Sequence, residues 1–155
     1  LYLRQGLGDN SAAWTRYTRL EVYARSMGLA VVMPEVQRSF YQEMAHGPDY
    51  FTYITQELPS LCRQMFRLSD KREDCFIAGL SMGGYGALKC TLGRPGQYAK
   101  AAAFAPAWLY LKEDLTALST PDGREGAAAV FGEQLPIDFL RAFGEVLVWR
   151  ADCDL

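Results

Sequence analysis

Residues 75–92 read CFIAGLSMGGYGALKCTL, a short apolar run joined directly to a segment with the composition of a helix. Within it, Gly79-Leu80-Ser81-Met82-Gly83 matches the pattern G-x-S-x-G. The pattern alone is common, but here a strand-like run precedes it and a helix-like segment follows it, which is the context it needs. The stretch therefore predicts a very sharp strand-to-helix turn at Ser81, a nucleophile elbow, with the small residues Gly79 and Gly83 leaving room for it.

Such a turn would raise the Ser81 hydroxyl above the carboxyl ends of the strands, where open α/β sheets bind ligands. The backbone N–H of Met82 would point at the same place and stabilise a developing oxyanion, aided by the helix dipole. Ser81 is thus a candidate nucleophile and Met82 a candidate oxyanion donor. The alternatives are an ordinary glycine-rich turn, which the context disfavours, and a phosphate-binding loop. The latter lacks G-x-x-x-x-G-K-[ST], and Lys89 lies about two turns into the helix.

Acyl transfer needs a second N–H donor, which in this kind of sheet comes from the loop after the strand before the first helix. Leu1-Tyr2-Leu3 reads as that strand and Gly6-Leu7-Gly8 as that loop. The Leu7 N–H is therefore the second candidate donor. An ordinary turn, capped by one of the polar residues 9–11, is the alternative, and both descriptions can hold together.

The rest of the chain alternates short apolar runs with segments of helical period, which predicts a mostly parallel sheet flanked by helices. We expect a helix over about 13–27, ended by Gly28, and strands buried on both faces at 29–33, 75–80 and 101–105. Residues 36–49 should form a loop, and the helical pattern of 51–65 should be kinked or restarted at Pro59. Between roughly 107 and 145, prolines and glycines indicate short helices of a cap-like insertion.

Composition narrows the class of protein. The 155 residues suggest one domain, half of them are apolar, and the net charge is −2 with both signs scattered. We therefore expect no nucleic-acid partner and no membrane association, since the apolar runs are also too short to span a bilayer. No leader peptide is visible. The cysteines form no C-x-x-C pair and there is one histidine, so no metal site is expected, and free thiols favour the cytoplasm.

Several short motifs are spread over nearly the whole chain. They include Gly6-Leu7-Gly8-Asp9-Asn10, Met33-Pro34-Glu35-Val36, Arg38-Ser39-Phe40-Tyr41, Glu57-Leu58-Pro59 and Gly79-Leu80-Ser81-Met82-Gly83-Gly84-Tyr85-Gly86-Ala87. Together they resemble the esterase D family, and within it the tributyrin esterase and acetylesterase branch, with S-formylglutathione hydrolases as close relatives. The chain differs from the family at Gln5-Gly6, where members usually carry His-Gly, and at Arg4, where the strand is normally apolar.

The resemblance implies an α/β-hydrolase fold and a serine carboxylesterase that hydrolyses small, short-chain acyl esters through an acyl-enzyme, without a cofactor. It also implies that Ser81 is the nucleophile and that Leu7 and Met82 are the oxyanion donors. An S-formylglutathione hydrolase, acting on a thioester, is one alternative. A catalytically inert binding protein is another, although an inert copy has no reason to keep a strained elbow. Assembly into a homo-oligomer stays open.

A serine hydroxyl needs a base, and in this fold the chain order is Ser, then Asp or Glu, then His. The only histidine, His46, precedes Ser81. We expect His46 to be a surface or loop-packing residue, with a base role in an unusual order as the alternative. Asp152 and Asp154 read as helix caps or a solvated turn rather than as the triad acid. We therefore expect residues 1–155 to be a partial α/β-hydrolase domain, truncated at both ends, that lacks the triad acid and histidine.

Overall fold

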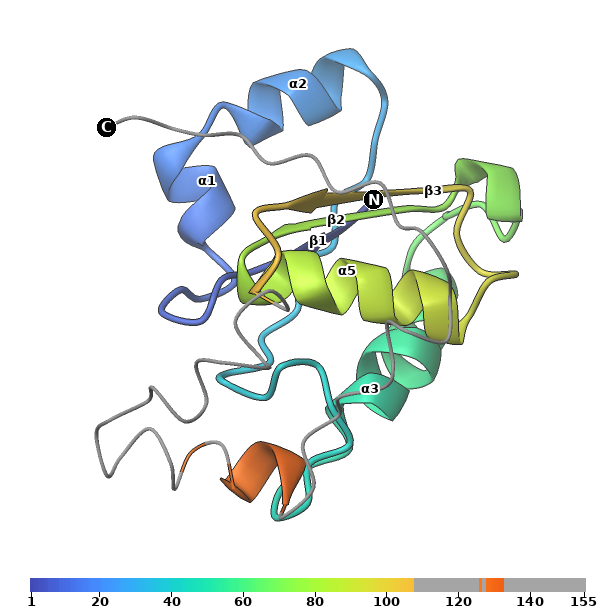
Figure 1. Ribbon diagram of the computed structural model, residues 1–155. Coiled ribbons are helices and arrows are strands. Elements are labelled where there is room, and N and C mark those ends of the chain that lie inside the picture. Colours follow the sequence, from blue (N-terminus) through green and yellow to red (C-terminus); the bar gives the residue numbers. More distant parts are fainter. Residues whose placement is uncertain (108–125, 127, 133–155) are drawn as a thin grey trace.

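The computed structural model describes residues 1–107, 126 and 128–132. At its centre is a parallel sheet in the order β1-β2-β3, formed by β1 (Tyr2–Arg4), β2 (Phe76–Leu80) and β3 (Lys100–Phe104) (Figure 1). Leu3 lies opposite Ala78, which in turn lies opposite Ala102. Because parallel neighbours need crossover connections, helices fill the intervening sequence. The predicted parallel sheet flanked by helices is confirmed.

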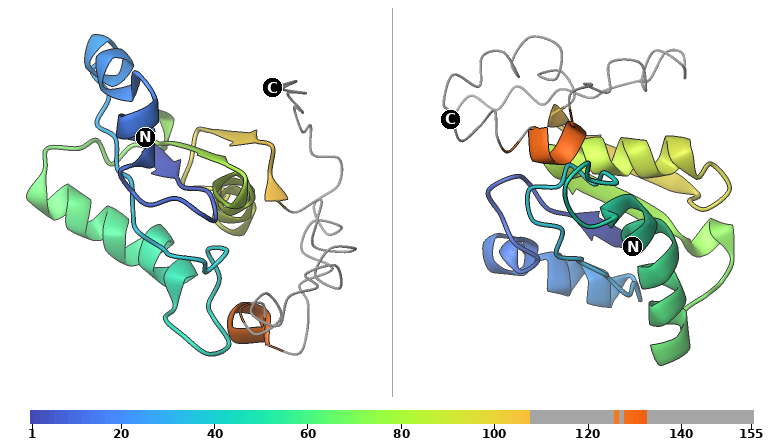
Figure 2. Two further views of the ribbon diagram at one scale, coloured as in Figure 1. Left: turned by 90° about the vertical axis from the view of Figure 1, so that its left-hand side faces the viewer. Right: turned by 90° about the horizontal axis from the view of Figure 1, so that it is seen from below.

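Helix α5 (Met82–Gly93) begins directly after β2 and packs against all three strands. It lies on the same side of the sheet as the helical segment 50–65, and α1 and α2 lie on the other side (Figure 2). Since β2 is the central strand, the β2–α5 junction stands at the middle of the sheet edge. The strand predicted at 75–80 and the helix predicted to start after Ser81 are both present.

The helix predicted over 13–27 is two short helices, α1 (Ala13–Tyr17) and α2 (Leu20–Ser26). The break is at Thr18, whose backbone is extended and whose hydroxyl donates to the Trp14 carbonyl while accepting from the Leu20 N–H at 3.1 Å. The threonine side chain thus ends one helix and caps the next, which the apolar period could not indicate. The predicted stop at Gly28 is correct, because this glycine has φ 64° and α2 ends in a Schellman-type pair of hydrogen bonds.

No strand forms over 29–33, contrary to prediction. The segment makes one parallel bridge, between Val32 and Tyr2, and the Val32 carbonyl accepts from the Leu3 N–H at 2.9 Å. Pro34 follows closely and has no N–H to continue a ladder. Ala30 is exposed, so the segment is also not buried on both faces.

The helical segment after the loop 36–49 is irregular, as Pro59 predicted. It runs as α3 (Tyr50–Thr52), a π-helical turn η1 (Tyr53–Glu57) and α4 (Leu58–Met65). Pro59 lies in the first turn of α4, where its missing N–H is least costly. A short 3-10 turn η2 (Arg72–Asp74) leads into β2.

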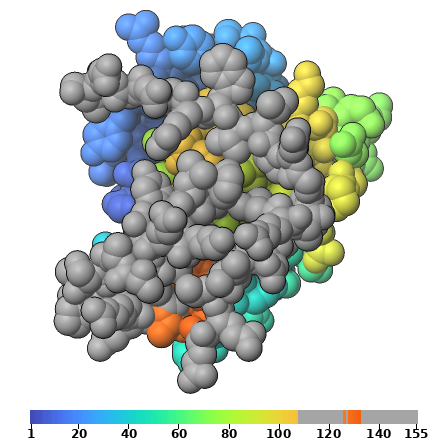
Figure 3. All heavy atoms as spheres, in the orientation of Figure 1, coloured from blue at the N-terminus to red at the C-terminus, as the bar shows by residue number. Residues whose placement is uncertain are grey.

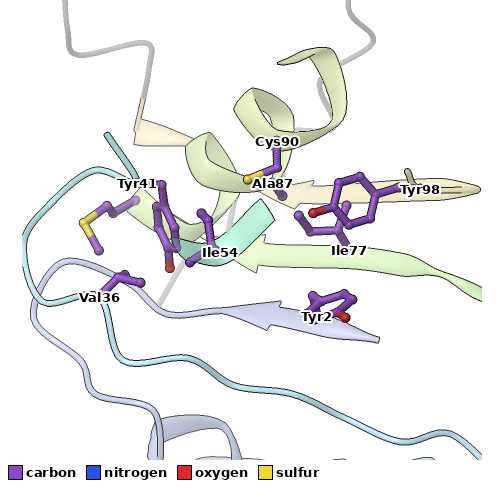
Figure 4. Packing of buried hydrophobic residues seen from close by; sticks show 9 residues of the cluster. Tyr2, Val36, Tyr41, Ile54, Ile77, Ala87, Cys90 and Tyr98 are labelled. Atoms are coloured by element: carbon purple, nitrogen blue, oxygen red, sulfur yellow. The ribbon is translucent and has the colours of Figure 1, made fainter. Parts of the chain in front are cut away.

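The core lies between the sheet, α5 and the loop 36–43 (Figure 4). Its buried members are Tyr2, Val36, Tyr41, Ile54, Ile77, Met82, Ala87, Cys90 and Tyr98. Strand β3 is not buried on both faces as predicted, because Lys100, Ala101 and Phe104 are exposed. Among the described residues it pairs with β2 alone.

Residues 126 and 128–132 lie at the end of the molecule opposite α1 and α2 (Figure 3). There the carbonyls of Ala129 and Val130 accept from the N–H groups of His46 and Ala45 at 2.9 and 3.1 Å. Most of the cap-like insertion predicted for 107–145 lies outside the described residues, as do Asp152 and Asp154.

Candidate active site at Ser81

The backbone of Ser81 is in a sparsely populated conformation, with φ 56° and ψ −121°. A non-glycine residue held there costs on the order of 1–3 kcal/mol, so the surroundings must impose it. The Ser81 N–H donates to the Phe104 carbonyl at 2.9 Å, and the Ser81 carbonyl accepts from the N–H groups of Tyr85 at 3.0 Å and Ala107 at 3.1 Å. The end of β3 and the first turn of α5 therefore hold Ser81 from two sides. The sharp strand-to-helix turn expected from the sequence is present.

The glycines on either side of Ser81 have no room for a side chain. A Cβ atom placed on Gly79 would lie 2.2 Å from the Gly83 carbonyl oxygen, and one on Gly83 would lie 2.4 Å from the Arg4 carbonyl oxygen. Real Cβ atoms do not approach backbone so closely. The elbow is therefore closed against itself and against the end of β1, and glycine is required by contact rather than only by chain flexibility.

The loop after β1 lies beside the serine. A Cβ atom on Gly6 would be 3.8 Å from the Ser81 Cβ and 3.8 Å from the Leu80 carbonyl oxygen. Leu7, the next residue, is exposed, whereas Met82 is fully buried. Neither the Leu7 N–H nor the Met82 N–H donates a hydrogen bond to any residue that the structure describes. Two free backbone donors thus lie on the segments that flank the Ser81 side chain.

Gln5 anchors the loop after β1 through its side chain. Its side-chain amide donates to the Asp9 carbonyl at 3.2 Å and to the Glu35 carboxylate at 2.8 Å. Glu35 also accepts from the N–H groups of Ser11 at 3.0 Å and Gln37 at 3.2 Å. Burial acts to raise the pKa of Glu35, but these hydrogen bonds to the carboxylate outweigh it and hold the pKa below its usual range. Gln5 thus ties the loop to the segment after Pro34.

Arg4, the residue that departs from the apolar pattern of the first strand, is fully buried at the end of β1. Its guanidinium lies 5.4 Å from the Tyr41 ring centroid and 5.9 Å from that of Tyr2. None of its three nitrogens has a hydrogen-bond partner among the described residues. The aromatic faces are therefore its main electrostatic compensation.

A polar cluster that the sequence did not single out links the loop 36–43 to α5. The Gln42 side-chain amide donates to the Tyr85 hydroxyl at 2.6 Å, and Lys89 donates to the Gln42 side-chain carbonyl. The Lys89 ammonium also lies 4.9 Å from the Phe51 ring centroid. Burial lowers the pKa of Lys89 to about 8 and raises that of Tyr85 to about 12. Residues 36–49 show no helical or strand periodicity, so the sequence contained no clear signal for this cluster.

His46 lies in an exposed turn closed by the bridge between Glu43 and Asp49. Its side chain makes no hydrogen bond to a described residue, and its backbone N–H donates to the Ala129 carbonyl. The prediction of a surface or loop-packing histidine is confirmed.

Among the described residues, no three His, Cys, Asp or Glu side chains are grouped as a metal site would require. In the same part of the chain Cys62, Cys75 and Cys90 are free thiols. No described helix has the length and apolar character needed to cross a membrane.

Comparison with known proteins identifies the family to which the chain belongs. A sequence model of the family described as "Putative esterase" matches residues 1–129. The chain belongs to that esterase family. An acetyl esterase of Caldicellulosiruptor saccharolyticus is 37% identical over 90 residues, which cover 57% of this chain and 34% of the relative.

Two solved structures of Staphylococcus aureus proteins are similar to this chain. The fluorophosphonate-binding serine hydrolase FphF, substrate bound, has a TM-score of 0.76 and 38% identity over 86% of this chain and 50% of its own. The S-formylglutathione hydrolase FrmB, as apoenzyme, has a TM-score of 0.70 and 37% identity over 91% and 53%. The fold is thus that of the α/β-hydrolase serine hydrolases, and the chain spans between a third and just over half the length of these relatives.

Proposed function

We propose that this chain carries the nucleophile and the oxyanion donors of a serine carboxylesterase acting on short-chain acyl esters. The observation that supports it best is the left-handed backbone of Ser81 at the β2–α5 junction, beside the loop after β1. A strained serine at the carboxyl edge of a parallel sheet has no packing purpose, whereas it serves a nucleophile. The family match and the acetyl esterase relative support a small acyl ester as the substrate class.

In the proposed reaction, the Ser81 Oγ forms a bond to the acyl carbon while its proton passes to a general base. The carbonyl oxygen becomes an oxyanion that accepts hydrogen bonds from the Leu7 and Met82 N–H groups. The bond from the acyl carbon to the alcohol oxygen then breaks, and the alcohol leaves with a proton. Water repeats the sequence on the acyl-enzyme and releases the acid. In the usual chain order the histidine that acts as the base follows the serine, and no histidine follows Ser81 in these 155 residues.

The Met82 N–H suits its proposed role because it belongs to the first residue of α5, where backbone donors have no partner within the helix. The positive end of the helix dipole adds to it at the position where negative charge develops. Removing one such donor typically costs about a hundred- to a thousandfold in turnover.

We also propose a cytoplasmic location, since the free thiols of Cys62, Cys75 and Cys90 are typical of a reducing compartment.

An S-formylglutathione hydrolase is the second candidate, favoured by the likeness to FrmB. It would use the same nucleophile and donors on a thioester. Turnover of acetyl esters and of S-formylglutathione, measured side by side on the same preparation, separates the two. The substrate class with the higher kcat/KM identifies the activity.

The serine assignment is tested by labelling with a fluorophosphonate probe. Because no histidine follows Ser81 in residues 1–155, the wild-type chain should form a covalent adduct at Ser81 slowly, located by peptide mass spectrometry after long incubation, and Ser81→Ala should form none. Ser60→Ala is the matched control, because Ser60 is an exposed helix serine and its loss should leave labelling unchanged. Labelling that survives in Ser81→Ala would refute the proposal.

A further inference from the structure

The loop 36–43 is held in an unusual conformation next to α5. Gln37, Phe40 and Tyr41 all have positive φ, at 50°, 49° and 56°. Each such non-glycine residue costs on the order of 1 kcal/mol or more, so the fold must gain something from this path of the chain. At its end the Tyr41 side chain is fully buried, and the Tyr41 N–H donates to the Ser39 hydroxyl at 3.1 Å.

Tyr41 lies between the serine helix and the loop proposed to hold the oxyanion. Its ring rests on Gly86, where a Cβ atom would come within 2.3 Å of the ring. Its hydroxyl donates to the Gln5 carbonyl at 3.0 Å. Figure 4 shows the ring standing between α5 and the chain that follows β1, with the hydroxyl directed away from α5. The Tyr41 side chain thus spans from α5, the helix that follows Ser81, to the peptide just before Gly6.

The loop that presents Tyr41 is fastened to the same helix. Tyr85 and Lys89 follow Ser81 by four and eight residues, so they lie on the same face of α5. Both are hydrogen bonded to Gln42, the neighbour of Tyr41. Phe40, on the other side, packs edge-on against the Tyr85 ring with centroids 6.1 Å apart. The position of Tyr41 is therefore set by α5 itself.

We propose that Tyr41 is a positioning residue that sets the Leu7 N–H relative to Ser81, an inference that rests on the proposed function. Tyr41 fixes the orientation of the Gln5 carbonyl, and the Leu7 N–H belongs to the next peptide unit along the chain. The Gln5 carbonyl is confined on its other side by α5, since a Cβ atom on Gly83 would lie 2.7 Å from it. An oxyanion donor works only when its distance to the oxyanion is held at about 3 Å, so a tether one peptide away matters.

The test is Tyr41→Phe, which removes only the hydroxyl, with Tyr98→Phe as the matched control. Tyr98 is as deeply buried, but its hydroxyl has no hydrogen-bond partner among the described residues. In Tyr41→Phe the Asp9 amide, whose N–H donates to the Gly6 carbonyl at 3.3 Å, should exchange with solvent roughly fivefold faster, since one hydrogen bond of about 1 kcal/mol is lost. The amides of β2 and α5 should keep their wild-type rates. Tyr98→Phe should change none of them.

Kinetics provide the second readout. For p-nitrophenyl acetate, kcat in Tyr41→Phe should fall by roughly tenfold with KM unchanged, because the lost interaction acts only on the transition state. Wild-type exchange at the Asp9 amide in Tyr41→Phe, or an equal effect of Tyr98→Phe, would overturn the inference. If Ser81 proves unreactive towards the fluorophosphonate, the proposed function fails, and amide exchange still decides whether Tyr41 holds the loop.

Discussion

Gly83, in the first turn of α5, lies directly against the carbonyl group of Arg4, the last residue of β1. The separation leaves no space for a methyl group, since a Cβ atom would be 2.4 Å from that oxygen and 2.6 Å from the carbonyl carbon. Both partners of this contact are backbone, so neither can move aside as a flexible side chain would. The contact joins the serine helix to the strand whose following loop carries Leu7.

Gly83→Ala should therefore destabilise the protein by about 3 kcal/mol, because a methyl group forced into close-packed backbone must displace α5 or β1. Thermal unfolding followed by circular dichroism measures the effect. Gly96→Ala is the matched control, since a Cβ atom there meets nothing within 4 Å. Equal midpoints for the two variants would contradict the close approach of α5 to β1.

Tyr41→Phe should lower the free energy of unfolding, whereas Tyr98→Phe should not. The Tyr41 hydroxyl donates a buried hydrogen bond, and its loss leaves the Gln5 carbonyl without that donor, at a cost of about 1 kcal/mol. The Tyr98 hydroxyl is buried and has no hydrogen-bond partner in the part of the chain that the structure describes, so its removal should be neutral or stabilising. Urea unfolding of both variants gives the two free energies of unfolding. A Tyr98→Phe variant that loses as much as Tyr41→Phe would show that the Tyr98 hydroxyl is paired.

Lys89 should make stability depend on pH in the mildly alkaline range. Its pKa is lowered to about 8 in the folded protein by burial, against 10.5 for the free side chain. Between these values the unfolded chain binds more protons than the folded one, so the free energy of unfolding rises with pH. The slope is at most about 1.4 kcal/mol per pH unit. Urea unfolding between pH 7.5 and 9 should show this rise in the wild type and a smaller one in Lys89→Met.

Lys71→Met is the matched control, because Lys71 is exposed and its loss should leave the wild-type slope. The series should stay below pH 9. Above it the unfolded chain ionises Cys75 and Cys90, which stay protonated when folded because burial raises the pKa of both thiols. Tyrosines follow at higher pH, because burial raises the pKa of Tyr2 and Tyr85 to about 12. These differences oppose the Lys89 slope. A Lys89→Met variant with the full wild-type rise below pH 9 would show that another group is responsible.

Ester turnover by residues 1–155 should be weak and indifferent to His46. The only histidine stands in an exposed turn before Ser81, and loss of a general base costs on the order of a million-fold in turnover. Hydrolysis of p-nitrophenyl acetate should therefore be slow, lost in Ser81→Ala and unchanged in His46→Ala. Fast turnover that disappears in both variants would instead identify His46 as the base.

Patterns in the sequence located the serine elbow because its requirements are local. Gly79 and Gly83 must flank Ser81, and an apolar run must precede it, so the motif and its context lie within one short stretch. The division of 13–27 into two helices was missed because a single threonine, Thr18, caps with its side chain. The strand predicted at 29–33 is only a single bridge, because an apolar run does not show how many of its residues will pair with a neighbouring strand.

The parallel sheet flanked by helices and the position of Ser81 could be predicted from the sequence, since periodicity and turn chemistry act between near neighbours. The surroundings of that serine depend instead on tertiary packing. Tyr41 reaches the Gln5 carbonyl across 36 residues, and Gln42 reaches Tyr85 across 43. Such contacts depend on how the loop 36–43 packs on α5. No local pattern encodes them, because they exist only once the sheet and its helices have brought these segments together.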